Sequence, residues 1–523
     1  SNTLTTTNSN ISFGNTINSD GTARNLTISS GTGITQFAGI VGGSSGVGDI
    51  DITGALDLNA AIANASSIAV SGTSNIGADV TTSGTQTYSG ATTFSASSTL
   101  TGSTVNFGST VDGGNNNIIV SGNADIDGAI TNTAALSVQG VGSTSNIGAD
   151  ITTTGVQFLG NATLSGTGDR TVTSTGGSNI TFYGITGASK GLTVDGGFQL
   201  STNDAIGLAS LSVTGASTLA ANVTSTGVQN YQSATTLGAN NTLTTTNSNI
   251  IFGGAVDSDG TTRNLTINTS AGTTQFAGVV GGTNAIGAID MTGALDLNAA
   301  IANAASLDVS GTSNIGADVT TTGTQGYSGT TTLSGGDRTL QGSTITMAAV
   351  TGTGPHDLKV TGNLDLDGSI TNVVELDITG TSNLGANVTT SGTQNYQGTT
   401  TLSGGDRTLQ GSTVTLAAVT GGSNALTVTG NLDLDGAISG VTNMSVSGTS
   451  NIGADVTTTG TQSYTGNRSL MRWLMRLVCG WKMERLRRKV SNRFGDCRHV
   501  MAFDVIWRIG FPGSPPSRDF WAF

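Results

Sequence analysis

The chain repeats itself over a long interval, and this repetition constrains the fold more than any other feature of the sequence. The segment TLTTTNSNISFG, which begins at Thr3, returns as TLTTTNSNIIFG from Thr242, and TGALDLNAAIANA returns unchanged. These matches lie 239 residues apart without a gap. Repetition at a fixed interval indicates a stacked repeat architecture, so an estimate of domain number from length alone does not apply.

A shorter module lies inside the long repeat and is marked by the phrase (S/T)N(I/L)GA(D/N)(V/I)TT. Its successive copies are separated by intervals of 71, 72, 96, 69 and 68 residues. The central apolar residue of the phrase is Ile76, Ile147, Leu219, Ile315, Leu384 and Ile452. The 96-residue interval contains an insertion with the stretch SDGTTRNLTI. We therefore predict a structural module of about 70 residues.

Apolar residues within a module alternate with a period of two, which is typical of strands. In STVTLAAV, the alternation predicts Val414, Leu416 and Ala418 on one face. Alternation resumes through Leu426 and Leu434, and small or Asn/Gly-containing turns such as GGSN, TGN and DG lie between such runs. We expect short strands joined by tight turns.

Strands this short bury a core only when they stack, so the prediction is a β-solenoid with turns of about 20–25 residues. Each module then supplies about three turns, and about twenty turns spaced by roughly 4.8 Å give a rod on the order of 100 Å long. An array of β-sandwich modules is the alternative. The solenoid is favoured because the 96-residue interval exceeds the others by about one coil.

Composition divides the chain into residues 1–466 and residues 467–523. The first part has a net charge of −21 and no Cys, whereas the second has a net charge of +8 and contains all four Trp and both Cys. A Cys-free chain suits an extracellular setting. No run of 18 apolar residues indicates a membrane span, and we expect any export signal to have been removed or to lie upstream.

The basic tail has two interpretations. Six apolar residues follow helical spacing among Arg and Lys, which would suit an anionic membrane or a partner groove: Leu470, Trp473, Leu474, Leu477, Val478 and Trp481. Alternatively, the tail is translated out of frame or is a degenerate end, and is not a folded domain. The second interpretation is favoured because composition changes abruptly within a module, after GTQSYTG.

The repeat phrases also carry a resemblance to a known family. GTQTYSGATTF, GTQNYQGTTTLSGGDRTLQGSTVTL and ALTVTGNLDLDGAI resemble the repeats of very large bacterial surface proteins of the filamentous haemagglutinin and β-strand-repeat adhesin type. The resemblance covers residues 1–466. It implies a right-handed parallel β-helix that is exported across the outer membrane and forms a stalk or adhesive fibre. The secretion domain usual at the start of such proteins is not visible.

Paired carboxylates are the main candidates for a functional site. The pairs are Asp125/Asp127, Asp365/Asp367 and Asp433/Asp435. A calcium site needs several oxygen ligands, and a glycosidase needs two carboxylates. However, the same slot reads Asp57/Asn59 and Asp296/Asn298 elsewhere, and an active site does not recur in every repeat. We favour solvated turn positions, keep calcium as the alternative, and expect no other cofactor.

Two recurring polar features have structural and functional interpretations. Five Asn residues recur at the module marker, where their separation of about three turns argues against an Asn ladder and favours a turn or strand-entry role: Asn75, Asn146, Asn314, Asn383 and Asn451. Threonine strings would suit an ice-binding or carbohydrate-binding face. Thr is also an ordinary solvent-facing strand residue, and we favour that interpretation.

The sequence lacks the parts of a recognisable active site. Residues 1–466 contain one His, His356, and one Glu, Glu375, whereas triads and zinc sites need several such groups. Their seven basic residues are spread along the chain, and Arg170, Arg338 and Arg407 occupy equivalent GDR slots. The negative charge and the absence of a phosphate-binding loop argue against nucleic-acid partners.

Together these features predict a non-catalytic, extracellular or cell-surface repeat region of a large bacterial protein. It would act as a stalk or as a multivalent surface for host or environmental glycans or proteins. The alternatives are a polysaccharide-acting β-helix enzyme, which would show one non-repeated groove with converging carboxylates and a basic residue, and an S-layer-like protein that associates with itself.

Overall fold

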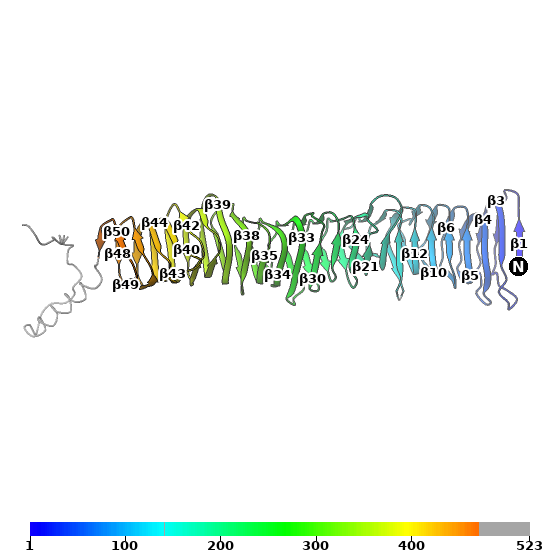
Figure 1. Cartoon of the computed structure of the whole chain (residues 1–523). Coiled ribbons are helices and arrows are strands. Elements are labelled where there is room, and N and C mark those ends of the chain that lie inside the picture. Colours follow the sequence, from blue (N-terminus) through cyan, green and yellow to red (C-terminus); the bar gives the residue numbers. More distant parts are fainter. Residues whose placement is uncertain (141, 470–523) are drawn as a thin grey trace, which may run out of the picture. The chain divides into compact units, whose positions relative to one another are not determined.

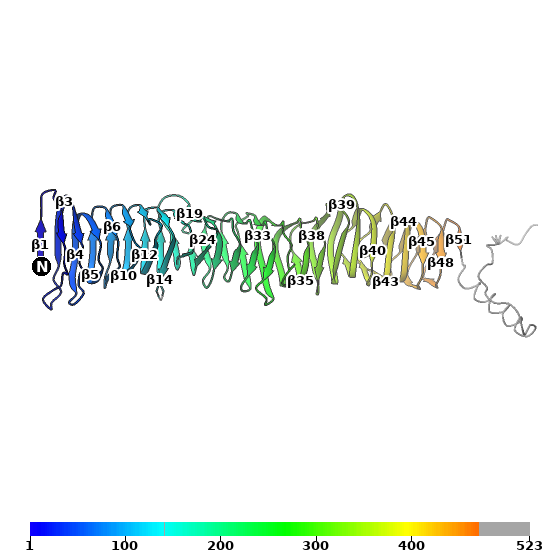
Figure 2. The same ribbon diagram turned by 180° about the vertical axis from the view of Figure 1, so that it is seen from behind.

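The fold is built from short strands that stack on one another in parallel. The computed structural model describes residues 1–140 and 142–469. This part contains 51 strands, from β1 (Asn2–Thr5) to β51 (Arg468–Ser469), and no helix. Its strand pairs are parallel and follow one another from one end of the stack to the other, as Figures 1 and 2 show. The described chain is therefore an all-β parallel solenoid of about 23 turns, roughly 110 Å long at ~4.8 Å per turn. The sandwich alternative would need antiparallel sheets.

One turn near the N-terminal end shows how the sequence produces this stack. β6 (Ser74–Ile76), β7 (Val80–Thr82) and β8 (Gln86–Tyr88) are three-residue strands. In each strand the first and third residues are buried and the middle one points outward, because successive side chains of a strand alternate. β9 (Thr92–Phe94) then pairs with β6. The turn closes after 18 residues and has three faces.

The number of residues in a turn depends on the length of the loops at its corners. Asn25 and Asp49 lie side by side on successive turns, so the turn between them is 24 residues long. It is longer because a loop enlarges one corner between β3 (Leu26–Phe37) and β4 (Val47–Leu58). The predicted range of 20–25 residues was therefore too long for the 18-residue turns, where three residues suffice to change direction.

The core is one continuous column of stacked side chains. Rings of successive turns lie on one another, with centroids of Tyr231 and Phe252 5.4 Å apart and those of Phe252 and Phe276 5.1 Å apart. Burial of apolar surface stabilises the stack by roughly 25 cal/mol per Å², and each turn needs its neighbours to achieve that burial.

Strand pairing explains the 239-residue repeat. Each residue in the following series pairs with the next, one turn further along the stack: Ser74, Thr92, Val111, Ile130, Ile151, Val172, Val194, Val213, Tyr231, Phe252, Phe276, Leu297 and Ile315. The series connects β6 to β36 (Ser313–Ile315), its counterpart in the second copy, by whole turns. The duplication therefore preserves the face on which each strand lies.

The shorter marker phrase does not repeat by whole turns. Three turns from Ser74 lead to Ile130 and four lead to Ile151, yet the next copy of the marker is β15 (Thr144–Ile147). β15 is the second strand after the one that holds Ile130, with β14 (Ala135–Gln139) between them. The prediction of about three turns per module was too low, because the marker moves to another face at each copy.

Corners limit how far the alternation can be extrapolated. β44 (Arg407–Thr420) buries Val414 and Leu416, but Ala418 is not buried, in contrast to the prediction, because the chain changes face after Leu416. At another corner Gly362 has a φ of +134°, and a Cβ there would collide with the backbone carbonyl of Gly342.

The described strands continue to Ser469, and the interpretations of the basic tail fall on residues 470–523, outside the described part.

Candidate functional site: polar ladders on the faces of the solenoid

The first Asp of each predicted pair lies on the outward side of a strand. Asp125, on β12 (Asn117–Ile126), is half-buried and accepts a hydrogen bond of 2.6 Å from Asn146 Nδ2 one turn away. Asp365 and Asp433 accept equivalent bonds of 2.7 and 2.8 Å from Asn383 and Asn451. The second member of each pair follows the end of its strand and is exposed: Asp127, Asp367 and Asp435.

These contacts identify the first Asp of each pair as part of a ladder between turns. In the most extended ladder, Ser12 Oγ donates to Gln36 (2.8 Å), Gln36 Nε2 donates to Asp57 (2.9 Å) and Asn75 Nδ2 donates to Asp57 (2.8 Å). Asn59 also donates to Asp57, at 3.0 Å. The duplicate copy repeats the arrangement around Asp296, with Gln275, Asn298 and Asn314 as donors.

Electrostatics at the two best-connected carboxylates follow from these bonds. Partial burial raises the pKa of Asp57, but hydrogen bonds from Asn75, Gln36 and Asn59 outweigh it and hold the pKa below its ordinary value. The same balance lowers the pKa of Asp296. The charged form of each carboxylate is therefore part of the folded ladder. Calcium binding at the predicted Asp pairs stays a prediction.

The recurring Asn residues do not have the predicted turn or strand-entry role. Asn75 is the middle residue of β6, and Asn314 and Asn383 are the middle residues of β36 and β41 (Ser382–Leu384). Each donates to a carboxylate on the preceding turn. The prediction was wrong because each marker Asn lies beside an Asp one turn away, whereas successive marker Asn residues lie more than three turns apart.

Three arginines of the GDR slots are structural. Arg170 and Arg407 are buried, and Arg170 donates to the carbonyl oxygens of Ser165 (3.0 Å) and Thr167 (2.8 Å). Arg407 Nε donates to the carbonyl oxygen of Leu384 at 2.9 Å. Arg338 donates likewise to Ser334, at 3.0 Å. A guanidinium group fits such corners because it presents several donors and no acceptor.

A buried Gln and Tyr pair was missed by the sequence analysis. In β43 (Gln394–Leu402), Gln394 Nε2 donates to the carbonyl oxygens of Val388 (3.3 Å) and Gln410 (2.7 Å), and Tyr396 Oη donates to Gln394 Oε1 at 3.0 Å. Gln86, Gln229 and Gln325 make equivalent contacts. The available signal was the recurrent Q-x-Y spacing, in which both side chains point to the same side of a strand.

A groove of about 600 Å³ lies near Gly352. A site that occurs only once in the chain would be expected here, because the neighbouring TGTGPHD segment is not repeated. His356 pairs in register with Val373, so His356 and Glu375 belong to adjacent strands, β39 (Arg338–Leu366) and β40 (Ile370–Ile378). The lining of the groove includes neither a carboxylate nor a basic side chain. It does not match the converging arrangement expected of a polysaccharide-acting enzyme.

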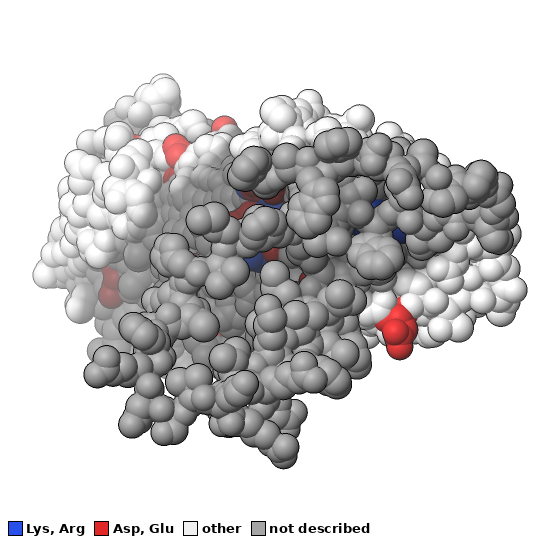
Figure 3. Space-filling view, turned by 90° about the vertical axis from the view of Figure 1, so that its left-hand side faces the viewer, with Lys and Arg blue, Asp and Glu red and all other residues white. Residues whose placement is uncertain are grey.

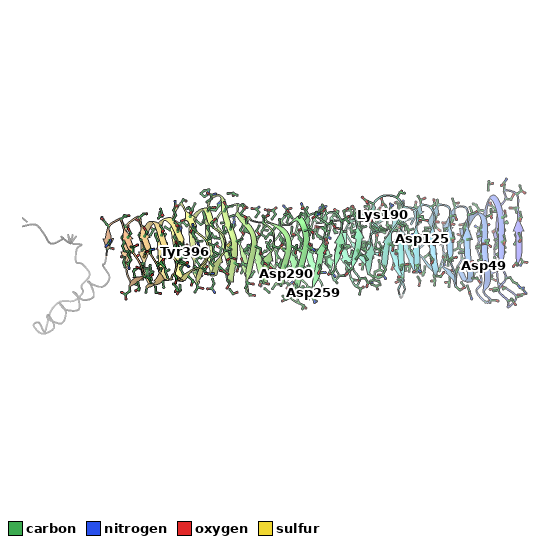
Figure 4. The ribbon with its side chains drawn as sticks, in the orientation of Figure 1. Asp49, Asp125, Lys190, Asp259, Asp290 and Tyr396 are labelled. Carbon is green, nitrogen blue, oxygen red and sulfur yellow. The ribbon has the colours of Figure 1, made fainter. Side chains whose placement is uncertain are left out.

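Charged side chains are distributed along the stack. Figure 4 places Asp49, Asp125, Lys190, Asp259 and Asp290 at different levels of the stack. Figure 3 shows the visible described surface as mainly uncharged, with isolated acidic and basic groups. Among the described residues, no three His, Cys, Asp or Glu side chains gather in a way that could hold a metal ion. The described part also has no helix long and apolar enough to cross a membrane.

Comparisons with known proteins add no assignment. No family model matches the chain, and neither a curated protein nor a solved structure matches it. The class that the geometry defines is a parallel β-solenoid with hydrogen-bonded polar ladders on its faces.

Proposed function

We propose that residues 1–469 form a non-catalytic extracellular rod of a large bacterial surface or secreted protein, acting as a stalk or a multivalent binding surface. The right-handed sense of the solenoid, implied by the resemblance to haemagglutinin-like adhesins, belongs to this proposal, as does a structural role for the 70-residue sequence module. The observation that carries it is the recurrence of the same outward Asp–Asn ladder on successive faces, in place of one distinctive pocket.

Such a surface would bind through many weak polar contacts. Glycan hydroxyls and protein backbone groups are suitable partners, because the ladders present both amide donors and carboxylate acceptors. Linked weak sites gain avidity without any new contact. The strength of attachment to a ligand-coated surface should therefore depend on the number of turns.

A register-preserving deletion tests this proposal. Removal of residues 14–252 joins Phe13 to Gly253, the counterpart of Gly14, and shortens the stack by one long repeat while preserving the faces. On a glycan array or an intact cell surface, the shortened chain should bind on the order of tenfold or more weakly than the full chain. Equal binding by both chains would contradict multivalency, and release of shortened sugar chains would favour the polysaccharide-acting enzyme.

A further inference from the structure

One strand of the solenoid departs from the Q-x-Y arrangement and carries its aromatic ring on the outward side. β17 (Gln157–Phe158) buries Gln157 as the other strands bury their Gln, but Phe158 is outward and only half-buried. Leu159 is fully buried, in the place that Tyr has elsewhere. The segment QFLGNATL (residues 157–164) is one residue shorter than its counterpart QNYQSATTL (residues 229–237). Because side chains alternate along a strand, a shift by one residue moves the ring to the opposite side.

Core packing does not account for the outward ring. In β28 (Gln229–Tyr231), Tyr231 Oη donates a hydrogen bond to Gln229 Oε1 at 3.1 Å. Gln157 lacks this donor, and its buried Oε1 has no hydrogen-bond partner among the described residues. A buried acceptor without a partner destabilises a fold. Departures of this kind from an otherwise consistent pattern are expected at functional sites.

Phe158 contacts a second ring at the outer surface. Its centroid lies 4.9 Å from that of Tyr183, and the two rings meet edge to face at 89°. Tyr183 follows β20 (Asn179–Phe182) on the next turn, and its backbone N–H donates to the carbonyl oxygen of Gly160 at 2.7 Å. At 36% exposure, it is the only exposed aromatic side chain of the described residues. Phe158 therefore supports an aromatic ring that faces the solvent.

Two asparagines lie beside Tyr183. Asn203 Nδ2 donates to Asn161 Oδ1 at 2.9 Å, across the intervening turn that holds Gly184. A Cβ at Gly184 would lie only 2.7 Å from the Cβ of Asn203, so the close approach of the amides depends on this glycine. The backbone N–H of Asn203 donates to the carbonyl oxygen of Tyr183 at 2.6 Å. Within the described part, Asn161 Nδ2 and Asn203 Oδ1 have no hydrogen-bond partner, which leaves an amide donor and an amide acceptor for a ligand.

We propose that four side chains form a binding site, here called the aromatic corner, for one sugar ring of a neutral glycan: Phe158, Asn161, Tyr183 and Asn203. The apolar C–H face of the sugar lies against the Tyr183 ring, while hydroxyls at its edge donate to Asn203 Oδ1 and accept from Asn161 Nδ2. The four side chains are uncharged, which suits a neutral sugar. Two rings are too small an apolar surface for a protein partner, which would need about 800 Å².

The aromatic corner rests on the proposed function, since it adds a glycan site to the same outer surface. It differs from the ladders because it occurs once among the described residues, where no other aromatic side chain is exposed. It should therefore bind a soluble sugar with a stoichiometry of one, without any contribution from the number of turns.

Calorimetric titration of the full chain with soluble neutral tetrasaccharides tests the aromatic corner. Cellotetraose, maltotetraose and mannotetraose present different hydroxyl patterns, and at least one of them should bind at a single site per chain. Phe158→Thr, which matches the outward Thr87 of β8, and Tyr183→Ala should each weaken that binding by about tenfold or more. Tyr183→Phe, which keeps the ring, and Thr87→Ala should bind as the unmodified chain does. Far-ultraviolet dichroism verifies that each variant is folded.

A graft from the same chain separates binding from stability. Replacement of residues 157–164 by QNYQSATTL, the sequence of residues 229–237, restores the buried Tyr–Gln hydrogen bond and removes the outward ring. The grafted chain should have a higher Tm than the unmodified chain and should no longer bind the tetrasaccharide. Retained binding by the grafted chain, or no binding of any of the three sugars by the unmodified chain, would overturn the aromatic corner.

The aromatic corner and the proposed function can fail separately. Removal of residues 14–252 also removes the aromatic corner, so the Tyr183→Ala chain serves as the full-length reference when attachment to a surface is compared by length. A length effect without tetrasaccharide binding would overturn the aromatic corner and leave the proposed function intact. Single-site tetrasaccharide binding without a length effect would support the aromatic corner and contradict multivalency.

Discussion

At the scale of single residues, the faces of the solenoid are held together by amide–carboxylate contacts between turns. The repeated sequence predicted that the Asp slots belong to the framework, since Asp57/Asn59 and Asp125/Asp127 occupy the same position. It did not predict that Asn75 is the partner of Asp57. That contact depends on the length of the intervening turn, which no local pattern specifies because corners of different size all satisfy the strand alternation.

The Asp57 and Asp296 ladders should contribute an acid-sensitive part of stability. Both carboxyls have a folded pKa below the ordinary value of 3.8. Their contribution is complete above that value and is lost as the pH falls through the folded pKa. Thermal melts of the Asp57→Asn/Asp296→Asn chain should therefore show a smaller loss of Tm below pH 4 than the unmodified chain. Asp51→Asn/Asp290→Asn, which changes exposed carboxylates in both copies, is the matched control. An unchanged acid dependence in the ladder variant would contradict this assignment.

At the scale of strands and corners, the buried Gln side chain of each Q-x-Y strand joins that strand to neighbouring corners by hydrogen bonds. The period of two predicted the inward and outward sides correctly for Leu426 and Leu434. It gave no reason to place Gln394 inside, because a buried amide is tolerated only when corner carbonyls lie within reach. The same corners explain why Ala418 was placed on the wrong side: alternation predicts the residues of a strand but does not indicate where the strand turns.

Gln394→Glu should destabilise the turns around it at neutral pH. The substitution preserves shape but replaces the amide donor by a carboxylate that faces the carbonyl oxygens of Val388 and Gln410. An uncompensated buried charge costs about 3 kcal/mol or more. Hydrogen exchange should therefore accelerate in residues 388–410, with partial recovery at pH 4, where a protonated Glu donates one hydrogen bond. Gln410→Glu, on an exposed side chain of β44, is the control. Unchanged exchange in the first variant would show that the amide is dispensable.

At the scale of the described stack, both the duplicated sequence and the fold require that segments be added or removed as whole turns. Strand pairing explains why the repeated unit is 239 residues long, because only a whole number of turns returns each strand to its own face. The sequence therefore sufficed to predict a solenoid and its approximate length. It did not suffice to predict turn size or the movement of the 70-residue marker between faces, since both depend on the sum of many corner lengths.

This rule predicts which internal deletions the solenoid tolerates. Removal of residues 74–91 takes out β6, β7 and β8, one complete turn, and brings Thr92 to the position of Ser74, with which it pairs. The shortened chain should retain its strand signal in far-ultraviolet dichroism and its resistance to protease. Removal of residues 74–85 takes out only two strands, so Gln86 would occupy the face of Ser74, and the strands of the first turn after the cut would meet the wrong neighbours on the turn before it. We expect a new cleavage site at that junction, because the turns after the cut lose their register with the few turns before it. Equal protease resistance of the two deletions would mean that strands pair with any face, and that the continuous columns of the core do not determine the stack.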